Sequence, residues 1–132
     1  MKVVLDTNIF ISGIFWKGNP NKIINLWKED SLILFTSKEI IDEFIEVMED
    51  FKIKMPPSII NEWVDLIIKK SILVQPKEKF NLIKDDPSDN KFLECAYKGK
   101  VNYIISKDKH LLKLKQFKNI KIVTPEEFLK NE

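Results

Sequence analysis

The sequence predicts an α/β fold in which a parallel sheet is flanked by helices. Segments with strand character alternate with amphipathic segments along the chain, which is the pattern of βαβ units. The first segment, 2–6, is a short apolar run that stops abruptly at Asp6, as a buried parallel strand does. A length of 132 residues fits one domain, so we expect a single domain over 1–132.

The first half of the chain contains two expected strands and the helices that follow them. A short helical stretch is expected over 9–15, and Pro20 can open the next helix because a missing N–H is harmless in a first turn. The second strand is expected over 32–35. The segment 36–39 has a cap hydroxyl and an acid three residues later, as in a capping box. It opens a helix with the apolar residues Ile40, Ile41, Phe44, Val47 and Met48.

The second half continues the alternation. The prolines of 56–57 precede an amphipathic helix, and 71–74 is a short strand candidate. Asp86 is the expected N-cap of the next helix, with Asp89 at its third position and Gly99 at its end. The remaining expected elements are a strand over 101–105, a short helix at Leu111, Leu112 and Leu114, a strand over 120–123 and a helix capped at 124–127.

The composition is that of an ordinary globular protein, with 44% hydrophobic and 32% charged residues. No apolar run approaches the roughly 18 residues of a membrane-spanning helix, and the N-terminus has no cleavable signal pattern. The single cysteine, Cys95, cannot form an internal disulfide, so we expect a cytoplasmic protein. With three glycines and no Walker-type or GxGxxG loop, a nucleotide cofactor is not expected.

Four acidic residues, Asp6, Glu43, Asp89 and Asp108, are the candidate functional residues. Two of them end strands and two lie early in helices. Ligands of open α/β sheets bind beyond the carboxyl ends of the strands, and four carboxylates gathered there would repel one another without a divalent cation. Since the chain has only one histidine and one cysteine, ligation by oxygen favours Mg²⁺ or Mn²⁺ over zinc.

Each acid also has a purely structural interpretation. Asp6 can cap the helix that follows it, and Asp89 suits the first turn of a helix. Glu43 borders an apolar helix face. These interpretations do not explain why two strand ends and two helix starts supply acids that could face one another. His110, the only histidine, is expected to be a partly exposed helix-start residue, and Cys95 a buried core residue.

A lysine-rich segment near the C-terminus is a candidate phosphate-binding surface. Eight lysines lie between Cys95 and Pro125, where Asp108 is the only acid. The candidates for RNA contact are Lys107, Lys109 and Lys113; the alternative is a solvated face without a partner. The chain contains no arginine, which disfavours bidentate, base-specific recognition.

Four motifs occur in order along the chain, at 3–10, 37–44, 86–96 and 103–108 with 111–112. Together they resemble the PIN-domain family, particularly the small bacterial VapC-like toxin components of type II toxin–antitoxin systems. The resemblance implies a three-layer α/β/α fold around a parallel sheet of four to five strands. Matched position by position, it implies the following site: catalytic, metal-binding acids Asp6, Glu43, Asp89 and Asp108, with supporting polar residues Asn8 and Ser106.

The resemblance also implies an activity and partners. It implies hydrolysis of RNA with Mg²⁺ or Mn²⁺, a cognate antitoxin protein and a homodimer. Asp86 is either an accessory acid or the helix cap, and His110 stands where many relatives have an acid. The amphipathic segment 53–72, with Trp63, is the candidate for dimer or antitoxin contact, and ordinary core packing is the alternative.

Other functions remain open from the sequence alone. One is a non-catalytic RNA-binding or partner-binding module on the same fold. Another is a housekeeping RNA-processing enzyme or a DNA nuclease. A haloacid-dehalogenase-type phosphatase also begins with a strand that ends in Asp. It requires a second Asp two residues further on, where this chain has Asn8, so it is disfavoured.

Overall fold

The computed structural model describes residues 1–50 and 55–130. The strands are β1 (Lys2–Leu5), β2 (Ile33–Thr36), β3 (Ser71–Leu73), β4 (Tyr103–Ile105), β5 (Gln116–Phe117) and β6 (Ile120–Val123). The helices are α1 (Thr7–Phe15), α2 (Asn19–Lys28), α3 (Lys38–Glu49), α4 (Pro57–Lys70), the 3₁₀ turn η1 (Pro87–Asp89), α5 (Asn90–Gly99), α6 (Lys109–Leu112) and α7 (Pro125–Lys130). Among the described residues, no helix has the length and apolar character needed to cross a membrane.

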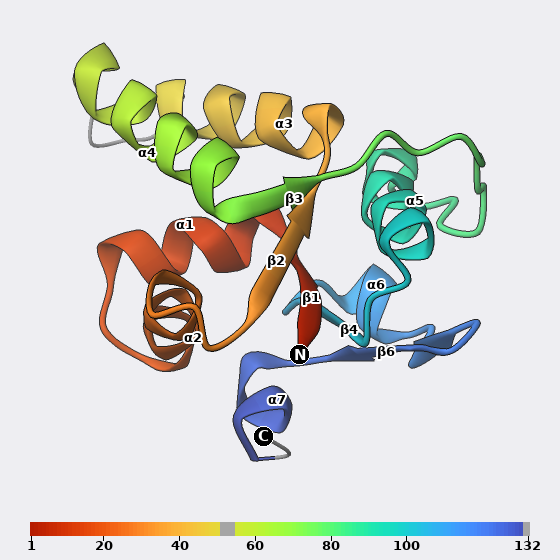
Figure 1. Ribbon diagram of the computed structural model, residues 1–132. Helices are drawn as coiled ribbons and strands as arrows, with labels where there is room; N and C mark the ends of the chain where they lie inside the picture. The colour runs from red at the N-terminus through yellow and green to blue at the C-terminus, as the bar shows by residue number, and fades with distance from the viewer. Residues whose placement is uncertain (51–54, 131–132) are drawn as a thin grey trace.

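The strands form one central sheet (Figure 1). Within the described part of the chain it has six strands, in the order β3-β2-β1-β4-β6-β5. The pairs β1–β2, β1–β4, β2–β3 and β4–β6 are parallel, and β5–β6 is antiparallel. The predicted α/β fold around a parallel sheet is confirmed. The two-residue β5 is the strand that the sequence did not predict.

Side chains that alternate along β1 point into two separate cores, because successive residues of a strand face opposite sides of the sheet. Val3 and Leu5 pack with residues of α1 to α4 and α7, whereas Val4 packs mainly with residues of α5 and α6. Figure 1 shows α1 and α2 on one side of the sheet and α5 and α6 on the other. The chain therefore has the three layers of an α/β/α fold.

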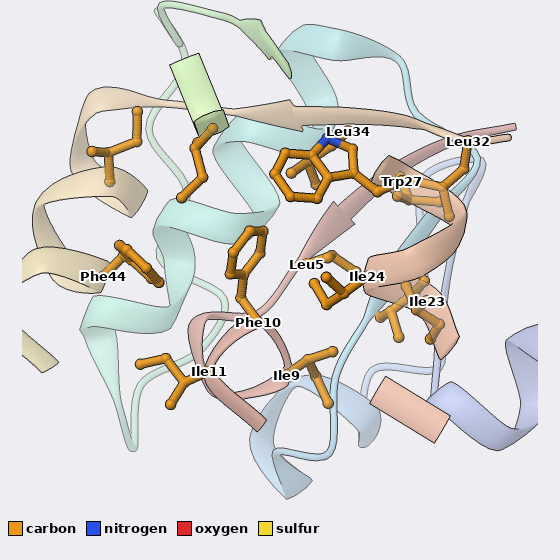
Figure 2. Close-up of a cluster of buried hydrophobic side chains, with 14 of the residues drawn as sticks. Leu5, Ile9, Phe10, Ile11, Ile23, Ile24, Trp27, Leu32, Leu34 and Phe44 are labelled. Atoms are coloured by element: carbon orange, nitrogen blue, oxygen red, sulfur yellow. The ribbon is translucent and has the colours of Figure 1, made fainter. Parts of the chain in front are cut away.

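An aromatic cluster centred on Phe10 fills the larger core (Figure 2). The Phe10 ring meets Trp27 edge-to-face at 5.3 Å and Phe44 at 5.4 Å between ring centroids. Aromatic pairs in this geometry add about 0.5–1.5 kcal/mol each beyond the area that they bury. Because Phe10, Trp27 and Phe44 come from α1, α2 and α3, the cluster fixes α1, which begins directly after Asp6, against its neighbouring helices.

Four of the described helices, α1, α3, α6 and α7, begin with a side-chain cap. At α7, Thr124 and Glu127 form the reciprocal bonds of a capping box, with Thr124 N donating to Glu127 Oε1 at 2.9 Å. At α3 the capping residue is Ser37, whose Oγ accepts from Ile40 N at 3.4 Å. The predicted box of 36–39 was wrong by one residue, because Thr36 is still part of β2 and pairs with Leu73 of β3.

Gly99 ends α5 for a reason other than backbone freedom. The left-handed residue after the helix is Lys100, with φ of 52°. A Cβ at Gly99 would lie 2.5 Å from Phe35 Cδ2, so the glycine is required by the close approach of α5 to β2. This packing holds α5, which follows Asp89 directly, against the sheet.

Helix α4 packs on the larger core through its inner face. Trp63 is half-buried, meets the Phe10 ring edge-to-face at 6.3 Å and lies under Lys28 Nζ at 4.9 Å. Core packing therefore accounts for Trp63. Within the segment 53–72, residues 53–54 lie outside the described residues, and a role of α4 in dimer or antitoxin contact stays a prediction.

Candidate metal centre

Asp6 follows β1 at the carboxyl edge of the sheet. Its backbone N–H donates to Ile105 O at 3.0 Å, continuing the β1–β4 ladder for one more residue. Its Oδ1 accepts from the backbone N–H of Asn8 at 3.3 Å, so Asp6 caps α1, and its Oδ2 accepts from Ser106 Oγ at 2.6 Å. The structural interpretation of Asp6 as the cap of α1 is therefore confirmed, and the same side chain, 5% exposed, lies at the carboxyl edge of the sheet.

Ser106 connects Asp6 to Asp108. It is fully buried at the end of β4, and its Oγ also accepts from the backbone N–H of Asp108 at 2.9 Å. Asp108 in turn caps α6, with its Oδ1 accepting from His110 N at 2.7 Å. Because β1 and β4 are adjacent parallel strands, residues that follow them meet at one edge of the sheet.

Three carboxylates form the most compact group of acids. Asp86, Asp89 and Asp108 each place a carboxylate oxygen within 4.8 Å of those of the other two. Asp89 is 6% exposed, and its Oδ2 has no hydrogen-bond partner among the described residues. Asp86 precedes η1 without a side-chain cap; its Oδ1 accepts from Ser88 Oγ at 2.7 Å. Asp86 stands at the predicted N-cap position, and its side chain lies near the carboxylates of the other two acids instead of making a capping bond.

Burial and mutual repulsion raise the pKa values of the two buried acids. Burial comes first for Asp89, followed by the charges of Asp108, Asp86 and Asp6, and its pKa rises from 3.8 to about 7. Burial also raises the pKa of Asp6, while the bonds from Ser106 and Asn8 oppose it. Carboxylates that repel one another in a buried position are stabilised by a cation.

Glu43 lies on α3 outside the compact group of described acids. Its Oε1 accepts from Thr7 Oγ1 at 2.6 Å, and its Oε2 accepts from Lys91 Nζ at 2.7 Å. Its charge contributes to the raised pKa of Asp6, so it belongs to the same electrostatic neighbourhood. Thr7 and Lys91 were not among the predicted site residues. Their positions inside the first and third motifs were the available signal.

The other predicted residues lie at the rim. The Asn8 side chain is exposed, and only its backbone contacts Asp6. Lys107, Lys109 and Lys113 are all exposed, and Lys107 Nζ lies 3.9 Å from Glu126 Oε1. His110 is half-buried at the start of α6, with its Nδ1 3.8 Å from Asp85 Oδ2.

The donor set fits a hard divalent cation. Every side-chain donor of the compact group is a carboxylate oxygen, which suits Mg²⁺ and Mn²⁺. Asp89 Oδ2 is a buried carboxylate oxygen without a hydrogen-bond partner among the described residues, and a bound cation would compensate its burial. Cys95, buried and with a pKa raised to about 12 by that burial, belongs to the core.

The protein is therefore a three-layer α/β/α domain with the acidic residues Asp6 and Asp108 at the carboxyl edge of its mostly parallel sheet. Residues 2–110 match the model of the PIN domain. The match covers more than half of the chain, and the chain belongs to the PIN-domain family.

The chain is also similar to one known protein in sequence and to two solved structures in fold. The chain is 33% identical over 141 aligned positions to the uncharacterized protein MJ1680 of Methanocaldococcus jannaschii, covering 98% of this chain and 90% of that protein. Its fold is similar to VapBC2 from Rickettsia felis bound to a DNA fragment from their promoter, with a TM-score of 0.63, 14% identity, and coverage of 94% of this chain and 98% of that one. It is also similar to PAE2754 from Pyrobaculum aerophilum, with a TM-score of 0.60, 9% identity, and coverage of 98% and 87%. At such identities, these two structures support the fold alone.

Proposed function

We propose that this protein is a metal-dependent ribonuclease that hydrolyses RNA phosphodiester bonds and acts as the toxin of a toxin–antitoxin pair. The observation that carries the proposal is the buried, unpartnered Oδ2 of Asp89 beside the carboxylates of Asp86 and Asp108. A nucleotide-binding loop is absent from the sequence, and the acids lie where ligands of α/β sheets bind.

Asp86, Asp89 and Asp108 would hold Mg²⁺ or Mn²⁺, with Asp6 beside them. The chemistry that such an ion supplies is neutralisation of phosphate charge and a lower pKa for a neighbouring water molecule. Ser106 orients Asp6 through its hydroxyl and fixes Asp108 through the same oxygen. Residues that orient ligands in this way change metal affinity when they are removed.

Exposed lysines next to the acids suit an RNA substrate. Lys107 and Lys109 flank Asp108 in the sequence, Lys113 follows α6, and all three are exposed, which supports their role as point charges that hold a flexible phosphate backbone. Single-stranded RNA exposes phosphates that can approach a site at a sheet edge. The absence of arginine from the sequence fits contact with phosphates better than recognition of bases.

The proposal extends to partners and location. The Rickettsia felis neighbour was solved as VapBC2, and we propose by analogy a cognate antitoxin partner for this chain. A homodimer, a cytoplasmic location and a single domain over 1–132 belong to the same proposal.

The experiment is cleavage of a mixed single-stranded RNA by purified protein with Mg²⁺, Mn²⁺ or EDTA. The comparison is wild type against Asp89→Asn and Asp108→Asn, with Asp42→Asn as the matched control, because Asp42 is an exposed acid next to Glu43 in sequence. Cleavage that requires metal and is lost in the first two folded variants supports the proposal. If the wild type binds RNA but leaves it intact, the protein is a binding module on the PIN fold. Cleavage confined to DNA would assign it to DNA metabolism.

A further inference from the structure

Lys91 lies beside Glu43 at the place where a metal ion bound by this carboxylate would be expected. Lys91 Nζ lies 2.7 Å from Glu43 Oε2, and the two side chains are 18% and 25% exposed. The neighbouring pair on the same helix, Lys38 and Asp42, is 2.8 Å apart but 82% and 51% exposed. Water screens the Lys38 pair strongly and the Lys91 pair much less, so only the latter has a well-fixed charge.

The second oxygen of Glu43 is also occupied. Thr7, which is 2% exposed and follows Asp6 directly, donates its hydroxyl to Glu43 Oε1 at 2.6 Å. Each oxygen of the Glu43 carboxylate therefore accepts a hydrogen bond from another side chain of the protein. Asp89 presents the opposite situation, since its Oδ2 is buried without a partner in the described part of the chain.

We infer that Lys91 is a positioning residue that takes the place of a metal ion at Glu43. Glu43 is then not a ligand of the ion held by Asp86, Asp89 and Asp108. This inference rests on the proposed metal centre and departs from the simplest expectation, in which all four predicted acids bind metal. Instead, the centre combines a three-carboxylate ion site with a separate, internally neutralised carboxylate.

The location of Lys91 explains how the pair serves the centre. Lys91 lies in the first turn of α5, two residues after Asp89, while Glu43 lies in α3. The pair therefore ties α3 to the turn that carries Asp89. The Thr7 bond ties the same carboxylate to the residue after Asp6. One carboxylate thus links the two segments that bring Asp6 and Asp89 to the centre. An unpaired Glu43 would add a further negative charge beside Asp6.

If Glu43 is not a metal ligand, substitution of Glu43 and substitution of Asp89 should change the affinity for Mn²⁺ by different amounts. The test is a titration of the purified protein with Mn²⁺ in the absence of RNA. Electron paramagnetic resonance measures the concentration of free Mn²⁺ during the titration. We expect Glu43→Gln to bind Mn²⁺ within about tenfold of wild type, as for a residue outside the ligand set. Asp89→Asn is expected to lose more than about 100-fold. Equal losses in Glu43→Gln and Asp89→Asn would overturn the inference while leaving a metal-binding nuclease in place.

Mn²⁺ binding by variants of Lys91 gives a second measurement, which would not change if Lys91 had a purely structural role. Lys91→Met leaves Glu43 without its cationic partner, so the affinity for Mn²⁺ should rise several-fold, since the unpaired carboxylate adds a negative charge beside Asp6. The double variant Lys91→Met with Glu43→Gln should return to about the wild-type affinity, and Lys91→Arg should keep it. Lys38→Met is the matched control and should change nothing.

Two further outcomes would decide against the inference. An unchanged affinity for Mn²⁺ in folded Lys91→Met would show that the lysine does not neutralise Glu43 in place of a cation. If the wild type binds no Mn²⁺, the inference fails together with the metal centre, and cleavage without metal would then be examined separately. Thermal unfolding of each variant establishes that it is folded. If Lys91→Met does not fold, the Glu43→Gln and Asp89→Asn comparison alone decides.

Discussion

Replacing Asp89 by asparagine should stabilise the metal-free protein at alkaline pH. Asp89 is buried beside Asp86 and Asp108, and its pKa is raised from 3.8 to about 7, first by burial and then by those charges. A carboxyl whose pKa is raised in the folded state favours folding below its unfolded value, and this contribution is lost as the pH rises through about 7. At pH 8 the folded protein therefore carries an unfavourable charge that asparagine lacks.

The magnitude follows from the pKa difference. The interval between 3.8 and about 7 corresponds to at most ~4 kcal/mol at pH 8. Water that reaches the edge of the sheet screens part of this, so we expect Asp89→Asn to be more stable by about 2 kcal/mol in EDTA. The advantage should shrink towards zero near pH 4. Saturating Mg²⁺ should stabilise the wild type more than the variant, because binding to the folded state adds to stability.

The assay is urea unfolding at pH 5 and pH 8, with EDTA or Mg²⁺. Asp42→Asn is the control, since this acid is exposed and paired with Lys38, and its removal should change the free energy of unfolding by less than about 1 kcal/mol. A difference between Asp89→Asn and wild type that does not grow with pH in EDTA would refute the reasoning. So would an equal stabilisation of both proteins by Mg²⁺.

Three further substitutions test the surroundings of the centre. Ser106→Ala removes the hydroxyl that serves Asp6 and Asp108, and should cost about 1–3 kcal/mol in urea unfolding and about 10–100-fold in Mn²⁺ affinity; unchanged affinity would contradict its orienting role. Phe10→Ala should cost about 3–5 kcal/mol by thermal unfolding, because it empties the centre of the aromatic cluster, and a loss below about 1 kcal/mol would not fit. Gly99→Ala should cost about 1–3 kcal/mol in the same assay through its contact with Phe35; no loss would show that α5 can move away.

The sequence predicts the strand ends of the centre well, because two signals coincide there. A buried parallel strand is an uninterrupted apolar run, so its end can be read from the sequence. Asp6 directly follows the first such run. Ser106 directly follows a later one, and Asp108 stands two residues further on. Adjacent parallel strands then place both at one edge, as the β1–β4 pairing shows. Ser106 was predicted only through the resemblance to the PIN-domain family, because a serine after a strand can also cap a helix or form a turn.

Contacts between distant elements could not be predicted in the same way. The bonds of Glu43 to Thr7 and Lys91 depend on how α3 and α5 sit on the sheet, which no local spacing encodes. The bond that Asp86 accepts from the Ser88 hydroxyl, in place of a capping bond to a backbone N–H, is likewise not visible in the sequence pattern. The cap of α3 shifted to Ser37 because β2 gains one more residue from pairing with β3, a strand about 35 positions later in the sequence.

The most direct test of the metal centre is the anomalous scattering of Mn²⁺ in a crystal of the wild-type protein soaked with that ion. We expect a peak within coordination distance of the Asp89 and Asp108 carboxylates, with Lys91 still beside Glu43. A peak bound mainly by Glu43, or no peak at this edge of the sheet with Mn²⁺ in excess, would contradict it.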